Sequence, residues 1–176
     1  ILLIALVVLA PVIAPYNPLE AVMKDANQAP SMAHLFGTDK LGRDVLSRIL
    51  YGGAYSLSSV LALVAIIFCV GTFLGLVAGY FGGLIVPVIM RVADMMISFP
   101  GVILAIAIAG IMGGSLVNAM IALTAVTWTK YARLSRSMVL KIRKRDFVDA
   151  AIVSGGTSSH ILWTHIMPNV VPILVI

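Results

Sequence analysis

The residues of this sequence that could do chemistry gather in two short polar clusters separated by apolar stretches. The first lies in FGTDKLGRDVLSRILYGGAYSL, residues 36–57, where aspartates alternate with basic residues. Aspartates placed in this way can cap a helix or pair with guanidinium groups, and the glycines mark turns. The second, RDFVDAAIVSGG at residues 145–156, holds two more aspartates just after a basic stretch. The chemistry open to both clusters is therefore capping and ion pairing.

Sequence patterns typical of enzymes are missing from the chain. It has no G-x-x-x-x-G-K-[ST] phosphate loop, no H-E-x-x-H motif and no G-x-S-x-G motif. We therefore expect it not to be an enzyme and not to hydrolyse ATP by the phosphate-loop route. We expect His34 to be a solvated loop residue, and Cys69 to be a packing residue. His160 and His165 have no cysteine or acid nearby in sequence, so we expect no metal site and no cofactor bound by this chain.

The composition indicates a membrane protein. Of the 176 residues, 61% are hydrophobic and only 11% are charged, whereas a soluble domain carries about 25% charged residues. The alternative, a soluble protein with an unusually apolar core, lacks the charges for a water-exposed surface. We therefore expect an all-α polytopic membrane helical bundle of about four full spans. Both ends lie in apolar runs too short to cross a bilayer, which predicts a fragment with partial spans at both ends.

The positions of proline, glycine and charged residues between apolar runs predict the order of segments in the first half of the chain. Residues 1–14 are expected to be a partial first span, and residues 15–54 an extracytoplasmic segment. The core membrane domain is expected over residues 55–176, beginning with a second span at residues 55–80. Three glycines at four-residue spacing give this span one small face, which favours close helix packing. They are Gly71, Gly75 and Gly79.

The third apolar region, residues 84–110, is interrupted by prolines and by two charges. Arg91 and Asp94 are three residues apart and so share a helical face. Because a charge at the bilayer centre is costly, we expect them to form an ion pair at a membrane edge. The span proper is then predicted over residues 96–112.

A fourth span is predicted to begin at residue 116, with Ser115 as its N-cap, and to continue as a helix past Lys130. Seven of the twelve Lys and Arg residues lie in residues 130–145. The positive-inside rule places this basic stretch in the cytoplasm, which in turn places residues 15–54 outside.

The stretch at residues 145–156 predicts a short cytosolic helix about 15 Å long. We expect Asp146 to cap it, with Asp149 three residues later, and Gly155–Gly156 to end it. One face is expected to be apolar and consists of Phe147, Val148, Ala151 and Ile152. A helix this short is marginal alone in water, so it must rest on the bundle, on the membrane surface or in a partner's groove. Its two acids suit anionic headgroups poorly, which favours a protein partner.

The same stretch resembles a loop of ABC importer permeases, E-A-A-x-x-x-G-x₉-I-x-L-P. Asp149, Ala150, Ala151, Gly155 and Pro168 occupy its positions. The departures are Asp for the first Glu, His165 for Ile and Met167 for Leu. THIMPN at residues 164–169 is similar to R-H-I-L-P-N of the peptide and nickel branch.

A second block resembles the G-T-D-x-x-G-R-D-x-x-S-R signature of dipeptide, oligopeptide and nickel permeases. GYFGG and MRVADMMISFP form a third block similar to the same family, so the resemblance covers nearly the whole chain. The matching signature residues are Gly37, Thr38, Asp39, Gly42, Arg43, Asp44, Ser47 and Arg48.

The resemblance implies a type I ABC importer transmembrane domain, of which this chain reaches into the fifth of about six spans. The protein would be a permease subunit for di- or oligopeptides or nickel in a bacterial or archaeal inner membrane. Its implied partners are ATPase subunits that hold ATP and Mg²⁺, a second and different permease subunit, and an extracytoplasmic solute-binding protein, with no nucleic acid. Residues 146–160 would be the cytosolic coupling loop. The resemblance assigns ATPase coupling to Phe147, Asp149, Ala150, Ala151, Gly155 and Pro168.

A transporter driven by an ion gradient is the alternative. It would need ionisable groups near the middle of a span, whereas Arg91 and Asp94 are expected at an edge. A membrane-embedded enzyme is disfavoured because its motifs are missing.

The predicted orientation can be tested by labelling in intact cells with an impermeant thiol reagent. Lys40→Cys should react from outside and Lys144→Cys should not, each compared in a background without Cys69. The reverse pattern would overturn the orientation.

Overall fold

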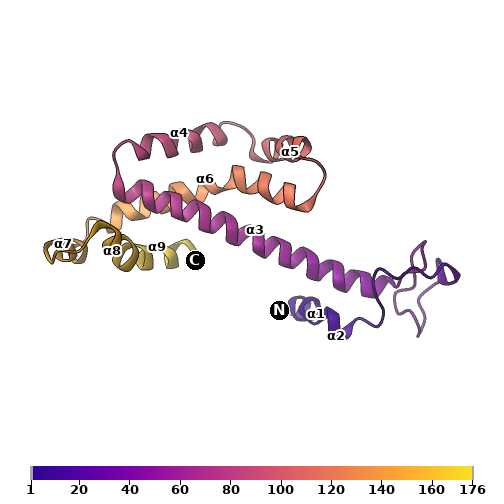
Figure 1. Ribbon diagram of the computed structural model, residues 1–176. Helices are drawn as coiled ribbons and strands as arrows, with labels where there is room; N and C mark the ends of the chain where they lie inside the picture. The colour runs from indigo at the N-terminus through magenta and orange to yellow at the C-terminus, as the bar shows by residue number, and fades with distance from the viewer. Residues whose placement is uncertain (1, 176) are drawn as a thin grey trace. The chain divides into compact units, whose positions relative to one another are not determined.

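The computed structural model describes residues 2–175, and every regular element within them is a helix (Figure 1). An isolated β-bridge joins Thr38 to Asp44. The prediction of an all-α fold is thus confirmed. The elements are α1 (Leu2–Val8), α2 (Ala10–Ile13), the 3₁₀ turn η1 (Met23–Asp25), α3 (Val45–Phe81), α4 (Ile85–Ile97), α5 (Gly101–Met112), α6 (Leu116–Ile142), α7 (Asp146–Val153), α8 (Ser158–His160), the π-helical turn η2 (Ile161–Ile166) and α9 (Met167–Val175).

The chain divides after Ala62, within α3, into two compact units. In the first unit, α3 begins at Val45, ten residues before the predicted second span. The helix starts here because Asp44 caps it: its Oδ2 accepts a hydrogen bond from the Ser47 backbone N–H at 2.7 Å. Gly52 and Gly53 follow without interrupting the helix. The last ten residues of the segment predicted over 15–54 are therefore helical.

In the second unit, the end of α3 packs directly on α6 through its three small residues. A Cβ atom placed on Gly71 would lie 2.5 Å from the Trp128 carbonyl oxygen. One placed on Gly75 would lie 2.4 Å from the Ala132 carbonyl oxygen. On Gly79 it would lie 2.7 Å from the Val139 Cβ atom. All three distances are too short for any side chain, so glycine at these positions lets the two backbones touch.

The region between α3 and α6 is a broken helix. Gly82 and Gly83, both with positive φ, form the turn after α3. The helix predicted over residues 96–112 is wrong as a single element. α4 ends at Ile97, α5 begins at Gly101, and their axes differ by 93°. Pro100 lies at the break, where its missing N–H and fixed φ interrupt helical hydrogen bonding. Both short helices pack on α6.

The start of α6 agrees with the sequence. Ser115 is its N-cap, and the hydroxyl oxygen accepts a hydrogen bond from the Asn118 N–H at 3.1 Å. The helix continues past Lys130 to Ile142, as predicted. In Figure 1, α4 and α9 lie on opposite sides of α6, and both contact it.

A single apolar cluster joins the elements at the α7 end of the second unit. Its buried members come from α3, α6, α7, η2 and α9, so the segment after α6 folds back onto the long helices. In η2 the Met167 N–H donates to the Leu162 carbonyl, one residue further back than in an α-helix. The buried members of the cluster are Leu76, Tyr80, Val139, Val148, Ile161, Leu162, Ile166 and Val170.

Among the described residues, α3 alone is long and apolar enough to cross a membrane by itself. The bent pair of α4 and α5 meets the same criteria when its two halves are taken together. α6 is 27 residues long but carries basic residues along its second half. The count of about four full spans stays a prediction.

The contact between α3 and α6 predicts that the same Gly→Ala substitution has different effects on stability at two positions of α3. Gly75→Ala should lower the free energy of unfolding by about 1–3 kcal/mol, because the added methyl group overlaps the α6 backbone. Gly52→Ala has nothing within 4 Å and should be neutral or stabilise by up to about 1 kcal/mol. Thermal unfolding of the detergent-solubilised protein measures both. Equal tolerance of the two would contradict the close contact.

Candidate functional site

The short helix α7 follows α6 after a turn of three residues. The expectation that Asp146 caps α7 is wrong. Arg145 occupies the N-cap position without a side-chain cap, and Asp146 is the first helical residue. Asp146 and Asp149 therefore both lie in the first turn, where a negative charge interacts favourably with the unpaired N–H groups.

α7 ends at its glycine pair, as the sequence predicts. The Gly155 N–H donates to the Ile152 carbonyl and the Gly156 N–H donates to the Ala151 carbonyl, both at 3.0 Å. This pair of bonds is the Schellman arrangement, which needs a left-handed residue just after the helix. Gly155 supplies it with φ of +82°, a conformation that side chains disfavour.

The bundle covers only part of the apolar face of α7. Val148 is fully buried in the cluster, and Ala151, one turn later, packs against it. Phe147 and Ile152 lie to either side of this line and are 43% and 51% exposed. The helix is thus held to the bundle along one line, while apolar side chains next to that line remain uncovered.

The remaining residues of the predicted coupling set are exposed. Asp149 and Ala150 are exposed on α7, and Gly155 is exposed after it. Pro168 is exposed in the first turn of α9, between η2 and the buried Val170.

The signature residues of the first unit meet around two carboxylates. Asp39 accepts hydrogen bonds from the Leu41 and Arg43 backbone N–H groups at 2.9 and 3.1 Å, and from Arg43 Nε at 2.9 Å. It is also ion-paired with Arg48. Gly42 has φ of +74°, and a Cβ atom there would lie 1.8 Å from the Val22 carbonyl oxygen.

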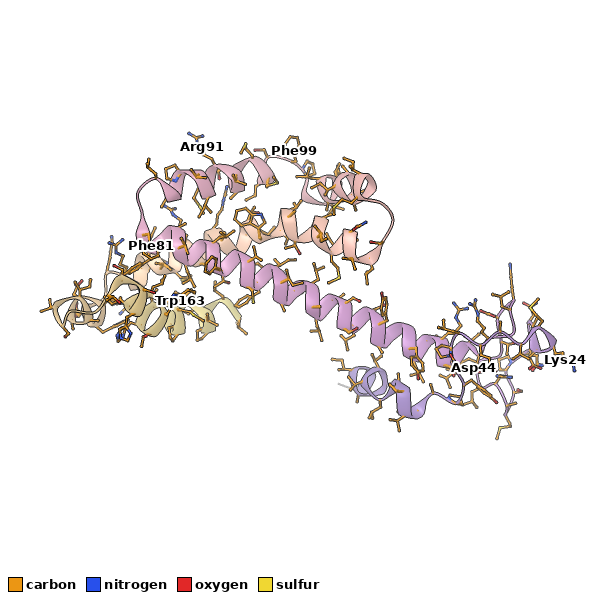
Figure 2. The ribbon with its side chains drawn as sticks, viewed as in Figure 1. Lys24, Asp44, Phe81, Arg91, Phe99 and Trp163 are labelled. Carbon is orange, nitrogen blue, oxygen red and sulfur yellow. The ribbon has the colours of Figure 1, made fainter. Side chains whose placement is uncertain are left out.

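The second carboxylate, Asp44, is almost entirely buried at the start of α3 (Figure 2). Besides capping α3, its Oδ1 lies 3.0 Å from His34 Nδ1. The expectation of a solvated His34 is wrong, because its side chain is 13% exposed and its ring lies 4.7 Å from the Tyr16 ring. The Tyr16 backbone N–H donates to Ser47 Oγ at 3.1 Å. Sequence reasoning missed Tyr16, which carries no local signal for this contact.

The other signature residues join this cluster from the preceding loop. The Thr38 hydroxyl donates to the Asp25 carbonyl and accepts from the Gln28 N–H at 2.8 Å. Gly37 has φ of +72°, and a Cβ atom on it would lie 2.4 Å from the Gln28 carbonyl oxygen. The two signature glycines therefore serve chain turns that pass close to other backbone.

Both carboxylates are held in their charged form. The side-chain hydrogen bond from Arg43 is the main cause that holds the pKa of Asp39 well below its ordinary value. For Asp44, burial alone would raise the pKa, but hydrogen bonds from the Ser47 amide and hydroxyl and from His34 outweigh it and lower the pKa.

The ion pair expected between Arg91 and Asp94 is replaced by one between helices. Asp94 of α4 pairs with Arg133 of α6, and Arg91 is exposed. The pair adds a polar tie to the packing of α4 on α6.

Known proteins resemble this chain along its whole length. Residues 71–176 match the family described as binding-protein-dependent transport system inner membrane component. A dipeptide transport system permease protein of Alkalihalophilus pseudofirmus is 40% identical over 173 residues, covering 98% of this chain and 57% of the relative. A glutathione transport system permease protein of Pectobacterium atrosepticum is 37% identical over 177 residues, covering 100% and 59%. A nickel transport system permease protein of Escherichia coli strain K12 is 36% identical over 162 residues, covering 92% and 58%. The chain thus spans less than two thirds of the length of these relatives.

Asp44→Ala should open the start of α3, because it removes the cap and the group that faces His34. An N-cap of this kind contributes about 0.5–2 kcal/mol. Hydrogen exchange of the peptide that covers residues 36–50 should become several-fold faster at pH 7. Asp25→Ala is the control, since that side chain makes one exposed hydrogen bond to Gln28.

The effect should depend on pH in one direction. Because the pKa of Asp44 is lowered from 3.8, its contribution is fully present above that value and is lost as the pH falls below it. The difference between wild type and Asp44→Ala should therefore shrink toward pH 3. A difference that grows on acidification would contradict the assigned contacts.

Proposed function

We propose that this chain, which belongs to the family of inner-membrane components of binding-protein-dependent transport systems, is a permease subunit of an ATP-driven ABC importer. The family predicted from the three sequence motifs is confirmed by the match and by the relatives. The all-helical architecture agrees with the transmembrane fold of type I importers. The names of the relatives support a di- or oligopeptide or nickel as the solute, delivered by a solute-binding protein.

The geometry of α7 carries the proposal. The helix has eight residues and is about 12 Å long, so tertiary contacts must hold it. Val148 anchors it to the bundle, while Phe147 and Ile152 are left uncovered beside two acids. Docking of a short helix in a protein groove would cover the apolar side chains. Anionic headgroups would repel the acids, so a protein is the better partner.

The partner we propose for α7 is an ATPase subunit that holds ATP and Mg²⁺. This chain has no phosphate loop of its own, so the energy of transport must come from elsewhere. Closure of the ATPase subunits on ATP would displace α7, and the apolar cluster would pass that displacement to the long helices. By linkage, the solute-side and nucleotide-side states then bias one another.

The remaining assignments follow from the same proposal. The chain would be a multi-pass subunit of a bacterial or archaeal inner membrane, with residues 15–54 outside and the coupling loop 146–160 inside. It would pair with a second, different permease subunit. An ion-driven transporter would need an ionisable group free to exchange an ion within a span. Asp94 is instead engaged by Arg133, and the relatives are binding-protein-dependent systems.

The coupling role of α7 predicts that two substitutions stop transport without preventing insertion. Asp149→Lys reverses a charge on the exposed side of α7, and Gly155→Trp places a bulky residue where φ is +82°. Each should lower ATP-dependent solute uptake by about tenfold or more, the loss expected when an interface contact worth about 1.4 kcal/mol is removed.

The control for charge is Ser137→Lys, which adds a cation at an exposed position of α6 outside the coupling loop 146–160. It should transport like the wild type at equal expression. A photoactivatable probe at position 150 should recover an ATPase subunit from native membranes. Normal uptake by Asp149→Lys and Gly155→Trp, or no ATPase in the crosslinked product, would count against the coupling role.

A further inference from the structure

Arg143 lies at the junction between α6 and α7, where the chain turns from one helix into the other. Its backbone N–H donates to the Val139 carbonyl at 2.8 Å, so it closes the last turn of α6. Two residues later the Arg145 N–H donates to the Ile142 carbonyl at 3.0 Å, and the Arg145 carbonyl accepts from the Val148 N–H at 2.9 Å. The junction is therefore hydrogen-bonded on both sides, to α6 and to α7.

The side chain of Arg143 reaches a third helix. Its Nη1 donates a hydrogen bond to the Tyr80 carbonyl oxygen at 2.9 Å, across 63 positions of sequence. Tyr80 is the penultimate residue of α3, so its carbonyl has no partner within that helix. A cation at this end of a helix also interacts favourably with the helix dipole. The bond thus satisfies an acceptor that would otherwise depend on solvent.

The guanidinium also lies over the Tyr80 ring, with Cζ 5.5 Å from the ring centroid. This is within the range of a cation–π contact. The ring is itself fixed, since it is 8% exposed and packs edge-on against Phe81 at the end of α3. Arg143 therefore holds both the main chain and the side chain of one residue.

Neighbouring basic residues do not share these contacts. Lys141 and Lys144 flank Arg143 and are exposed, and neither makes a side-chain hydrogen bond or ion pair within the described residues. Within the basic stretch, Arg143 thus joins α6 to α3 and Arg133 joins α6 to α4, while Lys141 and Lys144 are exposed. The positive-inside pattern alone cannot distinguish them.

We propose that Arg143 is a positioning residue that passes the displacement of α7 to the end of α3. This inference rests on the proposed function and names the contact through which a displacement of α7 would be transmitted to α3. Arg143 lies at the end of α6 and outside α7, the helix proposed to meet the ATPase. Its loss should leave ATPase docking and ATP hydrolysis unchanged. The displacement of the long helices in each ATP cycle, and with it the solute carried per ATP, should become smaller.

The test uses the complete transporter, with both permease subunits, ATPase subunits and binding protein, reconstituted in proteoliposomes. Solute uptake and ATP hydrolysis are measured together. Arg143→Gln should keep hydrolysis within about twofold of wild type and lower the solute carried per ATP by about tenfold. Arg143→Lys keeps the charge but loses the flat, forked donor, and should fall between Arg143→Gln and wild type. Lys144→Gln, the same charge change one residue away, should match the wild type.

Tyr80→Leu is a second variant that tests the same contact while leaving Arg143 unchanged. It removes the ring but keeps the carbonyl acceptor, so it should lower the solute carried per ATP less than Arg143→Gln does. If Arg143→Gln fails to insert into the membrane, Arg143→Lys and Tyr80→Leu decide the result. Wild-type coupling in both would then overturn the inference.

Two other outcomes would also overturn it. One is a wild-type ratio of uptake to hydrolysis in Arg143→Gln. The other is a parallel loss of uptake, hydrolysis and ATPase binding, which would make Arg143 a docking residue. Failure of the proposed function is distinguishable, because the wild-type complex itself would then show no ATP-dependent uptake.

Discussion

The close approach of α3 and α6 is the contact on which the rest of the second unit depends. In a bilayer, helices gain little from the hydrophobic effect, because lipid chains are as apolar as their side chains. Attraction must come from close van der Waals contact, and glycine at positions 71, 75 and 79 permits it. α6 then presents its other sides to α4, α5 and α9. A wider spacing would separate Tyr80 from Val139 and open the cluster that both belong to.

This cluster explains how α7 can be stable although it is so short. Val148 is its only fully buried residue, yet it packs among residues of four other elements. The two ends of α7 are stabilised in different ways. Two aspartates lie in its first turn, and a glycine turn follows its last residue. The helix is thus fixed at its base and termini, while its outer surface remains exposed.

Local signals in the sequence predicted local structure well. Ser115 as a cap and the glycine pair after α7 each act through neighbours within a few residues. Apart from the N-cap of α7, which is Arg145 and not Asp146, the errors discussed next lie where distant residues decide. Asp44 starts α3 earlier than hydropathy indicates because it is fixed by His34 and Ser47. Asp94 takes Arg133 as its partner across 39 positions instead of Arg91 on its own helix.

The candidate site shows the same division. The composition and limits of α7 could be read from its sequence, but which side it turns to the bundle could not. Residues 147, 148, 151 and 152 are all apolar, so hydropathy alone cannot predict which of them are buried. The neighbouring residues of α3, α6, η2 and α9 select Val148 and Ala151 for burial. Arg143 was likewise hidden within a run of similar charges.

The π-helical turn before α9 explains how Pro168 can be accommodated within this helical segment. In a regular α-helix the proline ring would collide with the carbonyl four residues earlier, and one hydrogen bond would be lost. The wider turn, in which Met167 bonds back to Leu162, absorbs one extra residue just ahead of the ring. One residue corresponds to about 100° of rotation around the axis. A normal turn here would therefore change the phase of everything that follows, and Val170 would face away from the interior it now fills.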